Sequence, residues 1–189
     1  VVGLVKEVDF PINPDGLTQA RQFVSPLIES ELLDSGENML AHADAVAQLL
    51  NSVGAAHDLQ IATYLGYAVP MLKRAPEILA KKFGKSLTVL AVDAAEIVKV
   101  QRQARLRILH QPTAEAEEIA LQTENVRKML LAFSRDLRVV LMRLGSRLQT
   151  LRFYASIKQI APRDLAQESL TVFAPLANRL GLWQLKWEL

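Results

Sequence analysis

The sequence predicts an all-α protein, and three observations support that prediction. Apolar residues recur at three- and four-residue spacing through most of the chain, which places them on one face of a helix. No segment alternates apolar and polar residues between turn pairs, as a half-exposed strand does. Only 8 of 189 residues are glycine and 8 are proline, and several of them separate one helical pattern from the next. A chain of this length can bury one core, so we expect a single multi-helix bundle.

Breaks in the apolar pattern divide the N-terminal half into expected helices. Residues 1–16 contain two prolines and a Pro-Asp-Gly turn signal, which predict an irregular lead-in before a bundle over residues 17–189. The expected helices cover residues 16–33, 37–52, 57–69, 76–82 and 86–109. The residues expected to end or separate them are Gly36, Gly54, Pro70 and Gly84. The 57–69 helix is apolar on most sides, which is typical of a helix at the centre of a bundle.

The strongest helical pattern lies between Glu124 and Tyr154, and it predicts one long helix or two nearly collinear ones. Its apolar face consists of Val126, Leu130, Phe133, Leu137, Val140, Leu144, Leu148 and Leu151. Most of the charged residues lie off that face and are expected to contact water: Arg127, Lys128, Arg135, Asp136, Arg138, Arg143, Arg147 and Arg152. Capping residues also predict a helix after Thr113 and another from Asp164 to Leu180.

Composition argues against several classes of protein. No apolar run approaches the roughly 20 residues that span a bilayer, so we expect no membrane contact. The chain has no cysteine, which leaves no disulfide and no thiolate metal ligand and fits a cytoplasmic protein. Its 22 basic and 20 acidic residues nearly cancel, so we expect no direct nucleic-acid binding.

Two segments resemble the N-terminal half of the long Rel/SpoT (RelA-type) alarmone enzymes. They are RKMLLAFSRDLRVVLMRLGSRLQTLR, from Arg127 to Arg152, and VFAPLANRLGLWQLKWEL, from Val172 to Leu189. The resemblance covers roughly residues 36–189. It implies a helical phosphohydrolase fold of the His-Asp (HD) type, which in that family uses manganese to remove the 3′ pyrophosphate of (p)ppGpp. It also implies that residues 17–189 are a fragment ending just before a synthetase domain.

The resemblance implies which positions of this sequence correspond to the family's metal ligands. Most of these positions do not carry the family's ligand side chains. His42, in Gly36-Glu37-Asn38-Met39-Leu40-Ala41-His42, keeps the place of the first histidine. The family's Leu-His-Asp-x-x-Glu-Asp reads Leu65-Gly66-Tyr67-Ala68-Val69-Pro70-Met71, and its Asp-Arg-Leu-His-Asn reads Ser146-Arg147-Leu148-Gln149-Thr150. One imidazole cannot hold a catalytic divalent ion, so we expect no metal and no catalytic residue. The expected vestigial positions are His42, Gly66, Tyr67, Pro70, Met71, Ser146, Gln149 and Thr150.

Other candidate residues have simpler structural explanations. Arg147 and Arg152 keep their family places and could contact a phosphate, although solvated or salt-bridged charges are the favoured reading. His57-Asp58 is a literal His-Asp pair, but it precedes the motif position and is expected in the first turn of a helix. His110 is expected in an exposed turn. We find no Gly-rich phosphate loop and no Ser/His/Asp constellation in the sequence.

These observations favour an inactive, regulatory HD domain of a RelA-like GTP pyrophosphokinase. The resemblance implies that the parent protein makes (p)ppGpp from ATP and GTP or GDP with Mg²⁺, in the stringent response. Its implied partners are the synthetase domain of the same chain, through an apolar patch near residues 182–189, and the ribosome, through other domains of the parent. The alternatives are an active metal-dependent (p)ppGpp 3′-pyrophosphohydrolase with unusual ligands and a helical protein-interaction module.

Overall fold

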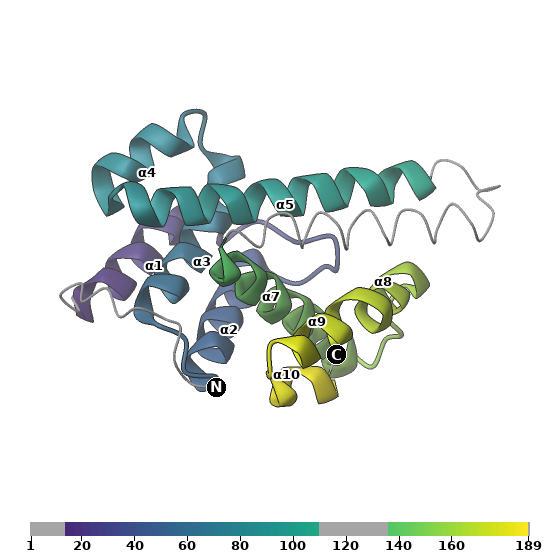
Figure 1. Ribbon diagram of the computed structural model, residues 1–189. Helices are drawn as coiled ribbons and strands as arrows, with labels where there is room; N and C mark the ends of the chain where they lie inside the picture. The colour runs from purple at the N-terminus through teal and green to yellow at the C-terminus, as the bar shows by residue number, and fades with distance from the viewer. Residues whose placement is uncertain (1–13, 110–135, 189) are drawn as a thin grey trace.

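A computed structural model describes residues 14–109 and 136–188 (Figure 1). Across these two ranges the chain is helical apart from short connections, and a lone bridge between Leu32 and Asn38 is the sole strand-like pairing. The helices are α1 (Pro14–Ile28), α2 (Met39–Ser52), α3 (His57–Ala68), α4 (Ala75–Phe83), α5 (Lys85–Leu109), α7 (Leu137–Ser156), α8 (Arg163–Glu168), α9 (Ala174–Arg179) and α10 (Trp183–Glu188). The all-α prediction is confirmed.

Helix α3 lies at the centre of the bundle, as its apolar character predicts. It packs against α1, α2 and α5, and α7 packs across α2 (Figure 1). Its buried residues belong to two core clusters: Leu59 and Ala62 to the cluster that includes α7, and Ile61 and Leu65 to the cluster that includes α1 and α4. Each fully buried leucine or isoleucine contributes roughly 1.5–3 kcal/mol to the free energy of folding. The two faces of α3 therefore join both halves of the fold.

The first helix ends at Ile28, not near Leu33, because the following backbone forms a tight hairpin. Leu33 N–H donates to Glu37 O at 2.9 Å, and Met39 N–H donates to Glu31 O at 2.9 Å. Gly36 turns the chain with φ 83°, a conformation that side chains disfavour. The helix also begins at Pro14, slightly before the predicted end of the lead-in; residues 1–13 lie outside the described part of the chain. The hairpin matters because it carries Glu37 into the interior.

The structure describes residues 136–154 of the Glu124–Tyr154 pattern, and residues 124–135 lie outside the described part of the chain. The extended Asp136 excludes the single long helix, whereas the alternative of two nearly collinear helices stays a prediction. Helix α7 begins at Leu137, and Asp136 precedes it in an extended conformation, with its carboxylate accepting from Arg138 N–H at 3.0 Å. Val140, Leu144 and Leu148 are buried as predicted, but Leu137 is exposed. The expected helix after Thr113 and the expected turn at His110 lie outside the described residues.

The helix predicted from Asp164 to Leu180 is confirmed as a continuous helical run over residues 163–179, with two differences in detail. Pro162, not Asp164, occupies the N-cap of α8, so Asp164 lies in the first turn. Between α8 and α9 the chain forms a π-helix over Ser169–Phe173, where Ala174 N–H donates to Ser169 O, five residues back. The proline at 175 explains this widening, because its ring clashes with a carbonyl one turn earlier in an ordinary α-helix.

The prediction of an exposed apolar patch near residues 182–189 is partly wrong. Leu185 is buried and Leu182 packs against the core, so neither side chain is free to form an exposed patch. The indole side chains of Trp183 and Trp187 lie outside the described residues. None of the described helices combines the length and the apolar character that a bilayer crossing requires.

Two helical glycines differ in the space beside them, which gives a test of the α2–α7 contact. A Cβ at Gly145 would lie 3.3 Å from Val46 Cγ1, whereas one at Gly66 would lie 3.6 Å from its nearest atom, Ala91 O. We expect Gly145→Leu to lower the free energy of unfolding by about 1–3 kcal/mol through overpacking. Gly66→Ala, the control, should raise it by about 0.5–1 kcal/mol. Urea unfolding measures both, and an unchanged stability in Gly145→Leu would contradict the close packing.

Candidate functional site

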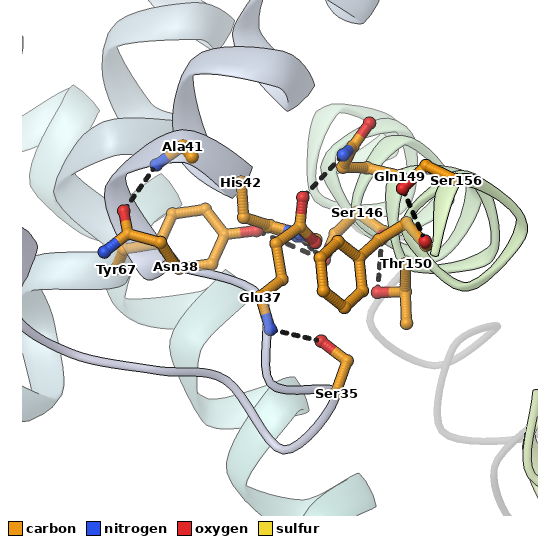
Figure 2. A network of polar contacts seen from close by, with 11 residues as sticks. Ser35, Glu37, Asn38, Ala41, His42, Tyr67, Ser146, Gln149, Thr150 and Ser156 are labelled. Carbon is orange, nitrogen blue, oxygen red and sulfur yellow. Dashed lines mark hydrogen bonds and ion pairs between the residues drawn. The ribbon is translucent and has the colours of Figure 1, made fainter. Parts of the chain in front are cut away.

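His42, Tyr67, Ser146 and Gln149 form a continuous hydrogen-bonded network with Glu37 between α2, α3 and α7 (Figure 2). His42, 1% exposed on α2, lies at its centre. Its Nδ1 is 2.6 Å from Glu37 Oε2, and its Nε2 is 3.2 Å from Ser146 Oγ on α7. Tyr67 on α3 donates its hydroxyl proton to Ser146 Oγ at 3.2 Å. The bundle thus brings His42, Tyr67 and Ser146 together, as their family places predict.

The donors and acceptors in this network form one continuous chain when the proton of His42 lies on Nδ1. Glu37 accepts at Oε1 from Gln149 Nε2 at 2.6 Å and at Oε2 from His42 Nδ1–H. With the proton on Nδ1, a neutral imidazole has Nε2 free to accept the Ser146 hydroxyl proton. Ser146 Oγ in turn accepts from Tyr67. With this tautomer each hydrogen bond donates in one direction, from Tyr67 through Ser146 and His42 to Glu37.

Burial keeps the Tyr67 phenol in its donating form. Removal from water raises the pKa of Tyr67 to about 12, because the phenolate loses solvation. The hydrogen bond to Ser146 and the positive charge of Arg143 act in the opposite direction but are smaller. The ring also contacts His42 edge to face, with centroids 5.5 Å apart. At neutral pH Tyr67 is a hydrogen-bond donor fixed against the imidazole.

The remaining vestigial positions contribute little to the network. Thr150 donates its hydroxyl proton to Ser146 O at 3.0 Å, one turn back in α7, rather than to the network side chains. Pro70 and Met71 lie exposed in a 3-10 turn, Val69–Met71, after α3. Gly66 is half-buried on α3 and carries no side chain.

The residues present do not fit a divalent metal ion. No three His, Cys, Asp or Glu side chains in the described part of the chain lie close enough together to hold one. Glu37 and His42 are potential ligands, but they bond to each other, and the second nitrogen of His42 faces a hydroxyl. A divalent ion needs several anionic or imidazole ligands to compete with water. Both ring nitrogens already have partners without one.

Arg147 is buried rather than exposed to water, but it is salt-bridged, which is the second of the two structural roles expected for it. It is 7% exposed, forms an ion pair with Glu168 on α8, and donates to Leu165 O at 3.2 Å. Its guanidinium carbon lies 4.5 Å from the ring centroid of Phe173, a cation–π arrangement. Arg152 faces water but pairs with Glu188 at 2.6 Å. A phosphate contact by Arg147 or Arg152 stays a prediction, and it would have to displace these carboxylates.

Arg143 is a second guanidinium on α7 that packs inside the protein, again contrary to prediction. Its Nη2 donates to Gln101 Oε1 at 2.6 Å, and its Nε is buried without a partner among the described residues. Burial, together with the nearby charge of Arg147, lowers the pKa of Arg143 to about 10. Because Nε lacks a partner, retaining the charge here costs folding free energy.

The other sequence candidates lie where simple structural roles place them. His57 is exposed, and Asp58 lies in the first turn of α3, as expected. Asp34 pairs with Arg102 at 2.7 Å. Glu37 is the residue that sequence reasoning missed as a site residue. Its position five residues before His42, directly after a glycine turn, was the available signal.

The Arg147–Glu168 pair should contribute much more to the free energy of unfolding than the exposed Arg152–Glu188 pair. We expect Glu168→Leu to lower the free energy of unfolding by about 3–5 kcal/mol, because it removes the carboxylate that faces a buried guanidinium. Arg152→Met, the exposed control, should cost less than about 1 kcal/mol. Thermal and urea unfolding of both variants provide the measurement. Equal losses would show that burial does not strengthen the Arg147 pair.

A double variant separates charge from packing at the same position. Arg147→Met with Glu168→Leu removes both charges and keeps apolar volume, so it should recover much of the stability that Glu168→Leu loses. A double variant as unstable as the sum of the two single variants would contradict a direct interaction between the two side chains.

Comparison with known proteins identifies the fold family. The family model described as HD domain matches residues 20–183. A Synechocystis relative, named as a probable guanosine-3′,5′-bis(diphosphate) 3′-pyrophosphohydrolase, is 34% identical over 82% of this chain and 19% of its own length. The Escherichia coli K12 bifunctional (p)ppGpp synthase/hydrolase SpoT is 30% identical over 92% of this chain and 23% of its own.

A relative with a synthetase name matches comparably. The Myxococcus xanthus GTP pyrophosphokinase is 29% identical over 93% of this chain and 22% of its own length. The chain therefore spans about a fifth of the length of these curated relatives. With the helical bundle, the place of His42 and these matches in agreement, the chain belongs to the HD domain family, as a RelA/SpoT-type HD domain.

Proposed function

We propose that this is a metal-free HD domain without (p)ppGpp hydrolase activity, serving as a regulatory module of a RelA-like GTP pyrophosphokinase. The observation that carries the proposal is the pairing of both His42 ring nitrogens, with Glu37 and with Ser146. In a metal-dependent hydrolase one of these nitrogens must face the ion. Here a serine hydroxyl faces it, and Glu37 is held by Gln149 as well.

An active (p)ppGpp 3′-pyrophosphohydrolase with unusual ligands is the second candidate. The names of the relatives favour it over the first, because the Synechocystis and Haemophilus influenzae proteins carry hydrolase names and the E. coli protein carries both activities in its name. The Myxococcus xanthus name favours the first candidate. In this chain the donor set around His42 weighs against hydrolysis, since no three His, Cys, Asp or Glu side chains among the described residues lie close enough together to hold a metal ion.

The proposed role is conformational. The parent protein would transfer pyrophosphate from ATP to GTP or GDP in its synthetase domain during the cytoplasmic stringent response, with ribosome contacts made by other domains. This domain affects that activity only if its contacts with the synthetase domain differ between the on and off states. The rigid helical bundle around α3 supplies a body that can transmit such a difference.

Metal dependence decides between the two candidates. We expect the purified chain to contain no stoichiometric manganese and to release no pyrophosphate from (p)ppGpp with added Mn²⁺. Neither EDTA nor Mn²⁺ should shift its melting temperature, whereas an ion at 100 times its Kd would stabilise the fold by about 2.7 kcal/mol. Elemental analysis, a pyrophosphate assay and calorimetry provide the measurements, with the E. coli SpoT protein as the positive control for the assay.

The contrary outcome is equally specific. One manganese per chain, with pyrophosphate release that His42→Ala abolishes, would establish the second candidate. Release that survives His42→Ala would point to a contaminating hydrolase, which a chain with both His42→Ala and Ser146→Ala would also retain.

A further inference from the structure

Three residues of the network have the order and spacing of a serine nucleophile with its base and orienting acid. Ser146 Oγ lies 3.2 Å from His42 Nε2, and His42 Nδ1 lies 2.6 Å from Glu37 Oε2 (Figure 2). Hydrolases that use a Ser-His-acid triad assign the same roles to the same two ring nitrogens. Both distances are within the range in which such groups exchange protons. Because Ser146 lies 104 residues after His42, only the fold reveals the arrangement.

Burial and fixed partners hold the base in its accepting tautomer. Glu37 is 5% exposed, and Gln149 occupies its other oxygen, so the carboxylate is aimed at Nδ1. The carboxylate keeps the proton on Nδ1 and stabilises the imidazolium that forms when Nε2 takes a proton. Ser146 is half-buried, so it is less enclosed than the 1% exposed His42.

A hydroxyl donor lies beside the serine. The Tyr67 hydroxyl is 3.2 Å from Ser146 Oγ and donates to it. To stabilise the negative oxygen of a tetrahedral intermediate, this hydroxyl has to turn from Ser146 Oγ to the carbonyl oxygen of the ester. The positive charge of Arg143 acts on Tyr67 and favours negative charge there. Glu37, by contrast, disfavours a polyanionic substrate close to His42.

We propose that Ser146, with His42 as base and Glu37 as orienting acid, forms a metal-independent nucleophilic site for small uncharged esters. Ser146 Oγ attacks the ester carbonyl carbon while Nε2 of His42 takes the hydroxyl proton. The carbon–oxygen bond to the alcohol then breaks, and the imidazolium returns its proton to the departing alkoxide. Water, deprotonated by the same nitrogen, cleaves the acyl-serine and regenerates the hydroxyl. This site does not depend on the regulatory role proposed above.

The full 189-residue chain can be tested with a fluorophosphonate probe and with p-nitrophenyl acetate. We expect one phosphonyl adduct per chain, mapped to Ser146 by peptide mass spectrometry, together with slow ester hydrolysis in the presence of EDTA. Ser146→Ala should lose both. Ser52→Ala, the matched control, removes a hydroxyl that donates to Leu49 O and should change neither.

Glu37→Gln tests the triad rather than the serine alone. Its amide N–H would donate to Nδ1, which places the ring proton on Nε2 and prevents it from accepting from Ser146. We expect a fall of roughly 100-fold or more in the labelling rate, by analogy with the wrong-tautomer effect in serine proteases. Circular dichroism checks that each variant is folded.

Ser146→Cys provides a second readout that does not depend on the alanine variant. Alkylation of this cysteine by iodoacetamide reports whether an electrophile reaches the position. If the fluorophosphonate does not label the wild-type chain, the proposal is overturned. Alkylation of the Ser146→Cys variant would then show that an electrophile reaches the position but that the serine is not activated. Absence of alkylation would show that the position is not accessible. Labelling at an unchanged rate in Glu37→Gln also overturns it.

Discussion

A histidine that is 1% exposed must have hydrogen-bond partners for both ring nitrogens, and the rest of the site follows from that requirement. Glu37 reaches Nδ1 because the 31–39 hairpin turns its side chain inward. Ser146 reaches Nε2 because α7 packs against α2 at Gly145, where no side chain intervenes. An unpaired nitrogen at this depth would cost about 1–3 kcal/mol. The contacts with Glu37 and Ser146 therefore leave both ring nitrogens of His42 with a partner.

The same two distances support both proposals, yet the proposals concern different chemistry. A nitrogen that faces the Ser146 hydroxyl is not available to an ion, which favours a metal-free domain. That nitrogen is also placed to take a proton from the hydroxyl, which favours a nucleophilic serine. If the chain binds no manganese and does not react with the fluorophosphonate, the regulatory proposal stands and the nucleophilic-serine proposal fails. If the chain is labelled at Ser146 and also hydrolyses (p)ppGpp, only the nucleophilic-serine proposal stands.

The sequence alone predicted the structure correctly where local signals determine it. Gly54 and Gly84 end α2 and α4 with positive φ, and the apolar character of the 57–69 segment predicts its central position. The sequence alone did not predict the structure where contacts between residues far apart in the chain determine it. The hairpin that ends α1 depends on the backbone hydrogen bond between Glu31 and Met39. The charge of Arg147 is paired inside the protein by Glu168, which lies 21 residues later in the chain. The order of Glu37, His42 and Ser146 depends on a contact across 104 residues.

The protonation of His42 tests the central claim most directly. In a sample labelled with ¹⁵N at histidine, we predict a neutral ring with a pyrrole-type Nδ1 and a pyridine-type Nε2, and NMR spectra of both nitrogens that do not change when Mn²⁺ or Zn²⁺ is added. Because the Glu37 and Ser146 hydrogen bonds determine this tautomer, its observation would support the whole network. A proton on Nε2, or a stoichiometric loss or shift of the Nε2 signal on metal addition, would show that His42 is still a metal ligand and would contradict the account.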